Sequence, residues 1–289
     1  MRPVSDVEAS DEIRQLYTSI RLALNVPTVP LFFTYLANYP VYFTTIVPEL
    51  LQNLQDEKFH ALTSSVGAEL SKRMKKYVPK DGEIGEWLNR YQYSPSMYHM
   101  RKSLMRVHEI NTSLAFISLA LREAVKGWAI AASKLDAPVS DSEKEHVVDL
   151  HHSNDDFVYK ELIPFAKEAI FEEEKIENSS DVKNGNVSEI VRSSKSGIEQ
   201  NLYVEYLHIC EHWFSTELKK ENYLYFRVIS EKAILLGLNN LPHPIYSPIN
   251  RVIDLVPTQK NFMDICLLLS EHFPTTSMQR VLFSGYMSF

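Results

Sequence analysis

Apolar residues recur at helical spacing along almost the whole chain. From Tyr98 onward, apolar and small residues follow one another at steps of three or four, which is the spacing of one face of an α-helix. No two runs of alternating apolar and polar residues are joined by Asn-Gly or Asp-Gly, the pairs that favour tight hairpin turns. The pattern therefore predicts an all-α protein.

Prolines and capping residues divide the first half into helices. Pro27 and Pro30 force an extended connection after the first helix, and Pro40 breaks or kinks the second. Asp11 is the predicted cap of the first helix. The predicted helices cover residues 11–25, 31–39, 41–54, 56–77, 83–91 and 98–135.

The helical pattern of the first half of the chain begins again in the second half. Residues 31–40 can be aligned with residues 157–166, which predicts two helical pseudo-repeats, 1–135 and 136–289. Two helices are expected early in the second unit, and the stretch rich in Ser, Asn, Lys and Gly that follows them is expected to be an exposed, mobile insertion. These helices cover residues 140–152 and 156–177, and the insertion covers residues 178–197.

The composition of the chain argues against several classes of function. A chain of 289 residues with 45% hydrophobic residues can bury a sizeable core, and its formal charge of -7 argues against nucleic acid as a partner. Only 8 glycines are present, and neither G-x-G-x-x-G nor G-x-x-x-x-G-K occurs, so a Rossmann or P-loop nucleotide site is not indicated. Two cysteines cannot form a disulfide framework.

Targeting signals are also absent from the sequence pattern. Residues 1–12 lack the apolar stretch of a signal peptide, and no window approaches the roughly 20 apolar residues that span a bilayer. We therefore expect a soluble, cytoplasmic protein without a membrane partner.

Asn111 is the first candidate for chemistry, because it falls on the apolar stripe of its predicted helix. A buried amide left without a hydrogen bond costs about 1 to 3 kcal/mol, so Asn111 needs a partner. Two interpretations stay open: a core amide that binds a neighbouring backbone, or an amide that lines a small cavity and holds a water or a substrate. The stripe consists of Leu104, Val107, Asn111, Leu114, Ser118, Leu121 and Val125.

The densest polar cluster is Asp149 to Phe157. Its carboxylates and imidazoles could suggest a metal, but adjacent histidines point about 100° apart on a helix. Ser153 and Asp156 also fit a capping box, which is the simpler interpretation. Asp156 could nevertheless act as a general base if Phe157 shields it from water.

His208, Glu211 and His212 match the zinc-peptidase pattern H-x-x-E-H. The apolar stripe of the same helix turns both histidines toward its polar flank, and no third ligand is evident, so zinc binding is not favoured. That stripe consists of Tyr203, Leu207, Cys210, Phe214 and Leu218. His243 is expected in a rigid turn between two prolines, and His272 at the C-terminus of a helix.

Four stretches in the same order resemble the group I (D,L-acting) 2-haloacid dehalogenases. The first is residues 20–29, and the second runs from Met100 through Asn111 to Leu121. The third is Asp149 to Phe157, and the fourth is residues 267–273, in the place of a pocket-lining helix.

The resemblance implies two AhpD-like helical pseudo-repeats packed as one body, and an enzyme that needs no cofactor. Carried over residue by residue, Asp156 is the base that activates a water and Asn111 holds that water with it. The water attacks the carbon bearing the halogen directly, without an ester intermediate. The implied partner is a small-molecule substrate, and whether the chain forms a homodimer stays open.

Several positions depart from the family. The family presents large aromatic groups around the substrate where this chain has smaller residues, so the pocket is expected to be wider or differently shaped. Asp155 replaces a small hydroxyl residue beside the catalytic acid, and its charge would repel an anionic substrate. The pocket residues of this chain are Thr28, Leu31, Leu114, Asp155 and Ser270.

The sequence thus supports three hypotheses. The first is a cofactor-independent hydrolase that acts on a 2-halocarboxylic or similar small acid. The second is a non-catalytic helical protein of the same fold that binds small molecules or a partner. The third, least favoured, is a zinc protein that uses His208 and His212.

Overall fold

The computed structural model describes residues 2–78, 80, 82–127, 188–217, 221–245, 249–256 and 258–288. All regular elements within these ranges are helical, and no strand occurs among them. The prediction of an all-α protein is confirmed. The proposed boundary at residues 135 and 136 and the predicted helices 140–152 and 156–177 lie outside the described residues, so the two-repeat organisation stays a prediction.

The N-terminal part forms three helices close to the predicted ones. The cap of the first helix is Ser10, whose side chain accepts from the backbone N–H of Ile13, so the prediction of Asp11 as the cap was one residue late. Pro40 occupies the first turn of the third helix, where its missing N–H costs nothing. The three helices are α1 (Asp11–Leu24), α2 (Leu31–Leu36) and α3 (Pro40–Leu54).

Three more helices complete the first half of the chain. Asp56 caps the first of them by accepting from the N–H of Lys58. The last one ends at Ala124 in a turn that contains Gly127 at a φ of 85°, so the prediction that it continues to residue 135 was wrong. The helices are α4 (Glu57–Tyr77), α5 (Glu83–Tyr91) and α6 (Pro95–Ala124).

The second half contains a long helix and then shorter ones. The long helix begins at Ser188, so residues 188–197 of the predicted insertion are helical rather than loop. The elements are α9 (Ser188–Glu217), α10 (Glu221–Gly237), the 3-10 turn η2 (Leu238–Asn240), α11 (Ile249–Leu255), α12 (Gln259–Leu267), the π-helical segment η3 (Leu268–His272) and α13 (Phe273–Met287).

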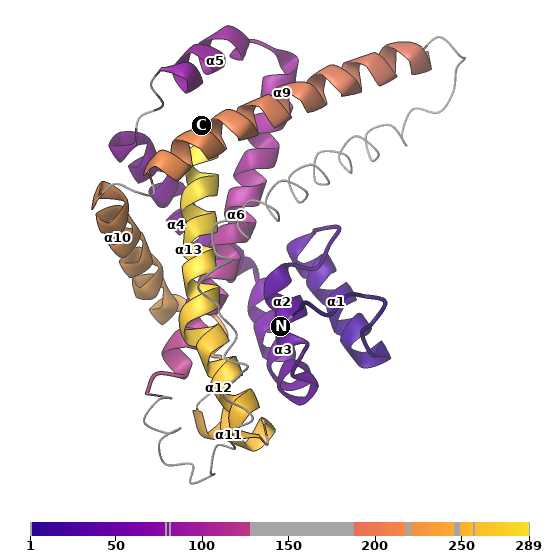
Figure 1. Cartoon of the computed structure of the whole chain (residues 1–289), viewed down its shortest axis with the longest axis vertical. Coiled ribbons are helices and arrows are strands. Elements are labelled where there is room, and N and C mark those ends of the chain that lie inside the picture. The colour runs from indigo at the N-terminus through magenta and orange to yellow at the C-terminus, as the bar shows by residue number, and fades with distance from the viewer. Residues whose placement is uncertain are drawn as a thin grey trace.

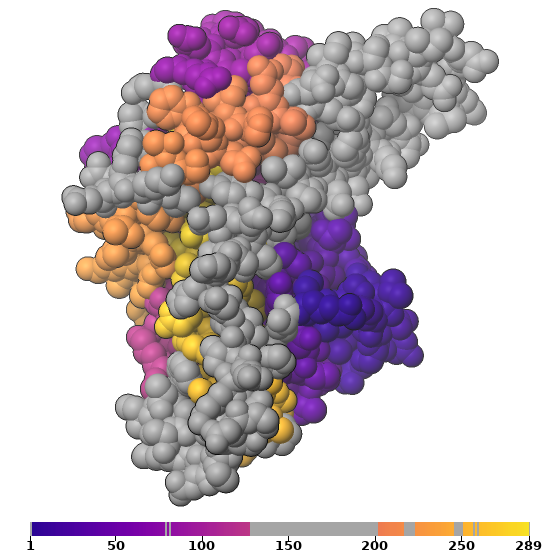
Figure 2. Space-filling model, viewed as in Figure 1, coloured from indigo at the N-terminus to yellow at the C-terminus, as the bar shows by residue number. Residues whose placement is uncertain are grey.

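The fold is built around α6 and α13, which run antiparallel through the middle of the molecule (Figure 1). α4 packs against both of them, α10 covers another side, and α9 crosses the end where α13 finishes. Figure 2 shows α9 over one end of the molecule and the α1–α3 segment along its flank. Buried apolar residues form two clusters, one that joins α1–α3 to the middle of α6 and one beneath α5 and α9.

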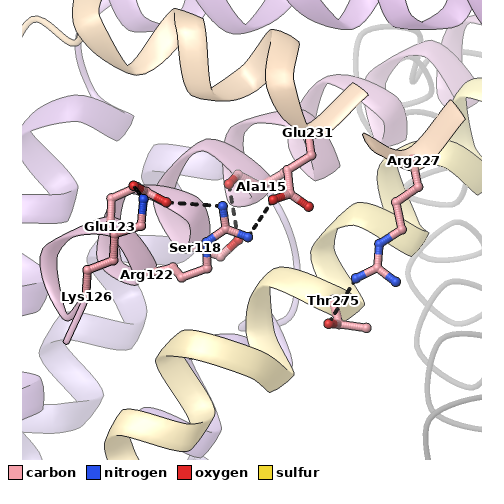
Figure 3. Close-up of polar contacts among 8 residues, drawn as sticks. All are labelled: Ala115, Ser118, Arg122, Glu123, Lys126, Arg227, Glu231 and Thr275. Atoms are coloured by element: carbon pink, nitrogen blue, oxygen red, sulfur yellow. Dashed lines mark hydrogen bonds and ion pairs between the residues drawn. The ribbon is translucent and has the colours of Figure 1, made fainter. Parts of the chain in front are cut away.

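Polar contacts fix α10 to the central pair. Arg122 of α6 donates to Glu231 of α10 at 2.6 Å and to Glu123 at 3.2 Å. Arg227 of α10 donates to the hydroxyl of Thr275 on α13 at 3.1 Å (Figure 3). These half-buried contacts define how α10 sits across α6 and α13. Within the described residues, every helix is either too short or too polar to cross a lipid bilayer.

Candidate functional site at the junction of α2, α6 and η3

Asn111 lies in the middle of α6 with only 6% of its surface exposed. Its side-chain Nδ2 is buried and has no hydrogen-bond partner among the described residues. An unpaired buried N–H costs about 1 to 3 kcal/mol. The sequence-based interpretation of Asn111 as a core amide that binds a neighbouring backbone is therefore not supported by the described contacts, and an amide that awaits a ligand or water fits them better.

The elements that carry Leu31, Leu114 and Ser270 are linked by buried contacts. Phe32 of α2 stacks on Phe273 at the start of α13, with ring centroids 4.6 Å apart. Phe32 and Phe273 belong to the same buried cluster as Leu114 of α6 and Leu268 and Leu269 of η3. The packing of this cluster brings α2, α6 and η3 together at one junction.

The π-helical segment η3 is the irregular part of this junction. It interrupts an otherwise continuous helix from α12 to α13, and such single π-helical turns occur frequently at functional sites. Ser270 lies within it, and the Ser270 Oγ is buried without a hydrogen-bond partner among the described residues. The Nδ2 of Asn111 on α6 and the Oγ of Ser270 on η3 are thus two buried polar atoms without a partner among the described residues.

The other predicted pocket residues differ in burial. Leu114 is buried, Leu31 is half-buried at the start of α2, and Thr28 is exposed in the connection between α1 and α2. Asp155 and Asp156 lie outside the described residues. Leu31, Leu114 and Ser270 therefore come from the elements that surround the junction, and the pairing of Asn111 with Asp156 stays a prediction.

Arg280 on α13 is a candidate that the sequence-based reasoning missed. It is the one charged residue in a helix of otherwise apolar and uncharged polar residues, and that isolation is the signal that could have revealed it. Only 7% of Arg280 is exposed. Burial lowers the pKa of its guanidinium to about 10, which still leaves it charged at neutral pH. A buried cation is costly unless an anion or several acceptors surround it.

His272 lies beside the junction as the last residue of η3. It is followed directly by α13, so the prediction that it ends a helix was wrong. Its ring approaches that of Tyr35 on α2 edge-on, with centroids 6.4 Å apart. Burial lowers the pKa of His272, so the ring is neutral near pH 7. His272 therefore contributes an uncharged aromatic contact between η3 and α2.

The predicted zinc motif is on the surface. The side chain of His208 is 87% exposed and lies 3.6 Å from Glu211, and His212 is also exposed. Tyr203, Leu207, Cys210 and Phe214 are buried, which confirms the predicted stripe for these four residues. In the part of the chain that the structure describes, no three His, Cys, Asp or Glu side chains are grouped as metal ligands would be.

Two open clefts lie along α4 and α6 without including Asn111. One of about 280 Å³ is lined by Lys72, Lys75 and His108, and one of about 540 Å³ by His60, Arg106 and Glu109. His108 forms part of the cleft wall, but both of its ring nitrogens lie within hydrogen-bond distance of protein atoms. Neither cleft is lined by any of the site residues that the sequence predicts, so the junction remains the candidate site.

Comparison with known proteins agrees with this architecture. No family model matches the sequence, and no curated protein matches it either. The solved structure of a D-2-haloacid dehalogenase mutant has a TM-score of 0.64 and 13% sequence identity, over 99% of this chain and 94% of that chain. The complex of D-2-haloacid dehalogenase with L-LA has a TM-score of 0.62, with the same identity and coverage. At this identity the likeness shows the fold, and this chain has the fold of D-2-haloacid dehalogenase.

Proposed function

We propose that this protein is a cofactor-independent hydrolase that replaces the halogen of a small 2-halocarboxylic acid with a hydroxyl group. The proposal is supported by the likeness in fold to D-2-haloacid dehalogenase over almost the whole chain. The observation that carries it within this chain is the buried Nδ2 of Asn111, which has no partner among the described residues.

In the proposed reaction, Asn111 and Asp156 hold one water between them. The Nδ2 of Asn111 donates to the water oxygen, and the carboxylate of Asp156 accepts a water proton. The water oxygen then attacks the carbon that bears the halogen, the carbon–halogen bond breaks, and halide leaves with the bonding electrons. The products are a 2-hydroxy acid of inverted configuration, halide and a proton. A positioned base of this kind typically contributes about 10² to 10⁴-fold to the rate.

Burial of the junction suits this chemistry. The walls that Phe32, Leu114 and Leu268 provide are apolar and nearly free of solvent. Excluding bulk water strengthens the attraction between a carboxylate and the proton that it removes. It also leaves a single positioned water as the nucleophile.

Halide release from D- and L-2-chloropropionate by the purified full chain tests the proposal directly. Asp156→Asn should abolish release while circular dichroism and the melting temperature show a folded protein, because an amide cannot accept the proton. In a single turnover in ¹⁸O-labelled water, the label should enter the product hydroxyl and not Asp156. Label on the Asp156 carboxylate would instead mean an ester intermediate and contradict direct attack by water.

The non-catalytic alternative gives a different result in the same experiment. A folded protein that binds small carboxylates but releases no halide from either enantiomer would be a binding protein of this fold. Aromatic residues introduced at Thr28 and Leu31 then separate two cases. Halide release by Thr28→Phe/Leu31→Phe would indicate an enzyme whose pocket has diverged, and continued inactivity would favour the binding protein.

A further inference from the structure

The two open clefts beside α4 and α6 adjoin each other, because Ser64 and Glu109 line both of them. We call the two clefts together the α4–α6 groove. Along α4 the groove extends from His60 to Lys75, a helical length of about 22 Å. At about 3.3 Å per residue, that length corresponds to roughly seven residues of extended chain. The groove can therefore accommodate a short peptide segment that lies across both clefts.

The charged side chains that line the α4–α6 groove are mainly cationic. Lys72 and Lys75 line one cleft and Arg106 lines the other, whereas Glu109 is the one carboxylate among the lining residues. Both lysines are exposed, and neither forms a hydrogen bond with a described residue. Arg106 donates to the carbonyl of Asn25 at 2.7 Å, which uses one of the five N–H donors of a guanidinium. In a chain with a formal charge of -7, this groove is a locally positive surface, complementary to carboxylates.

The groove also offers apolar surface beside the lysines. Met105 is 53% exposed, and it lines the same cleft as the exposed Ala68. Ser71, His108 and Ser288 are the buried residues of this cleft, and their polar atoms already bond to protein atoms. A ligand therefore gains its polar contacts from the exposed cations and its apolar contact from Met105, whose flexible side chain adapts to the shape of a partner.

We propose that the α4–α6 groove binds a short acidic peptide segment of a partner protein. Its carboxylates pair with Lys72, Lys75 and Arg106, and an apolar side chain between them packs on Met105. This interaction goes beyond the proposed hydrolase function and does not depend on it.

The lining of the groove favours a peptide over the other anionic ligands. No Phe, Tyr or Trp is among the residues that line the two clefts, so the groove has no aromatic platform on which nucleic-acid bases could stack. Glu109, where the clefts adjoin, repels a continuous run of phosphates but accepts an uncharged residue in the middle of a peptide. A small ligand is usually enclosed by its pocket, whereas both clefts are open.

Fluorescence anisotropy of the full chain with two labelled peptides tests the proposal. The probe is fluorescein-labelled Glu-Asp-Glu-Leu-Leu-Glu-Asp-Glu, and the control peptide carries Lys in place of every Glu and Asp. We expect the acidic peptide to bind and the basic peptide not to bind at a protein concentration of about 100 μM. Binding should weaken as NaCl is raised to about 300 mM, because salt screens exposed charges.

Charge-reversal variants at exposed positions locate the binding site. Lys72→Glu/Lys75→Glu should weaken binding of the acidic peptide about 10- to 100-fold, because two attractive contacts become repulsive. Lys58→Glu/Lys76→Glu is the matched control. It makes the same change in net charge on the same helix, at exposed residues that do not line the groove, and it should change the affinity less than about 3-fold. Glu109→Gln should tighten binding about 2- to 5-fold, because it removes a repulsive charge.

Four results would overturn the proposal. The first is that the acidic peptide does not bind, and the second is that both double variants weaken its binding equally. The third is that a fluorescein-labelled octamer of uridine RNA binds more tightly than the peptide, which would assign the groove to nucleic acid. The fourth is a dimer in sedimentation velocity that Lys72→Glu/Lys75→Glu converts to a monomer, which would make a second copy of this chain the occupant.

Discussion

The imidazole of His108 on α6 contacts Ser284 on α13 and Gly67 on α4, and it thereby joins three helices. The Nε2 of His108 lies 2.8 Å from the backbone carbonyl of Gly67 on α4 and donates to it, so in the neutral ring Nδ1 accepts from the Ser284 hydroxyl on α13 at 3.0 Å. Burial lowers the pKa of His108, which keeps the ring neutral near pH 7. A Cβ at Gly285 would lie 3.1 Å from the ring, so the glycine permits this close approach.

Ser284→Ala should therefore destabilise the protein by about 1 to 3 kcal/mol, because it leaves the buried Nδ1 of His108 without a donor. Ser118→Ala is the matched control. Ser118 is also a buried helical serine, but its hydroxyl bonds only to the carbonyl of Ala115 within its own helix, as Figure 3 shows. Urea unfolding of both variants measures the difference. Equal losses would mean that the contact between the helices contributes nothing.

Asn111→Leu should leave the free energy of unfolding within about 1 kcal/mol of the wild type or raise it, because it removes a buried donor that has no described partner. It should abolish halide release if the proposed function holds. Asn53→Leu provides the contrast, since Asn53 donates to the carbonyl of His243 at 2.8 Å and accepts from its N–H at 3.2 Å. That variant should lose about 1 to 3 kcal/mol. A large loss of stability in Asn111→Leu would mean that Asn111 is a structural residue.

Lys80 should make stability depend on pH. Its ammonium donates to the Tyr206 hydroxyl at 3.0 Å and to the carbonyls of Met287 and Ser288 at 3.2 and 3.0 Å. Burial, with smaller contributions from Lys75 and Arg101 and against an opposing one from Cys210, lowers the pKa of Lys80 from 10.5 to about 7.

The direction in which stability changes with pH follows from the number of protons that the folded and unfolded states bind. Between pH 7 and 10.5 the unfolded chain holds the Lys80 proton and the folded chain does not, so the contribution of Lys80 to stability rises with pH in that window. Urea midpoints between pH 7 and 9.5 should show a smaller rise with pH in Lys80→Met than in the wild type. Lys72→Met, at an exposed position, is the control. An unchanged slope in Lys80→Met would contradict the lowered pKa.

Both cysteine thiols should be inert in the folded protein. Cys210 and Cys266 are fully buried, and burial raises the pKa of each thiol to about 12. The thiolate is the reactive form, so at pH 8 Ellman's reagent should not react with the native chain. In guanidinium chloride it should label both cysteines. Rapid labelling of the native protein would show that one of these helices opens readily.

Much of the helical framework could be predicted from the sequence, because helix boundaries depend on local chemistry. Asp56 begins α4 by capping its first turn, and residues 83–91 form α5 as predicted. The buried stripe of α9 at Tyr203, Leu207, Cys210 and Phe214 also follows from spacing alone. Predictions failed where local signals are weak: polar residues 188–197 do not exclude a helix, and apolar spacing after Ala124 did not keep α6 helical through Val125–Gly127.

For the candidate site too, some features could be predicted from the sequence and others depend on tertiary packing. Spacing alone placed Asn111 on the apolar stripe of α6, because one helix fixes which of its residues share a face. Only the tertiary structure decided that the Nδ2 of Asn111 has no described partner, and that His108 and Ser284 set the level at which α13 lies against α6. Arg280 stands out in the sequence as the one charged residue of its helix, but its burial depends on contacts between helices, which no local pattern encodes.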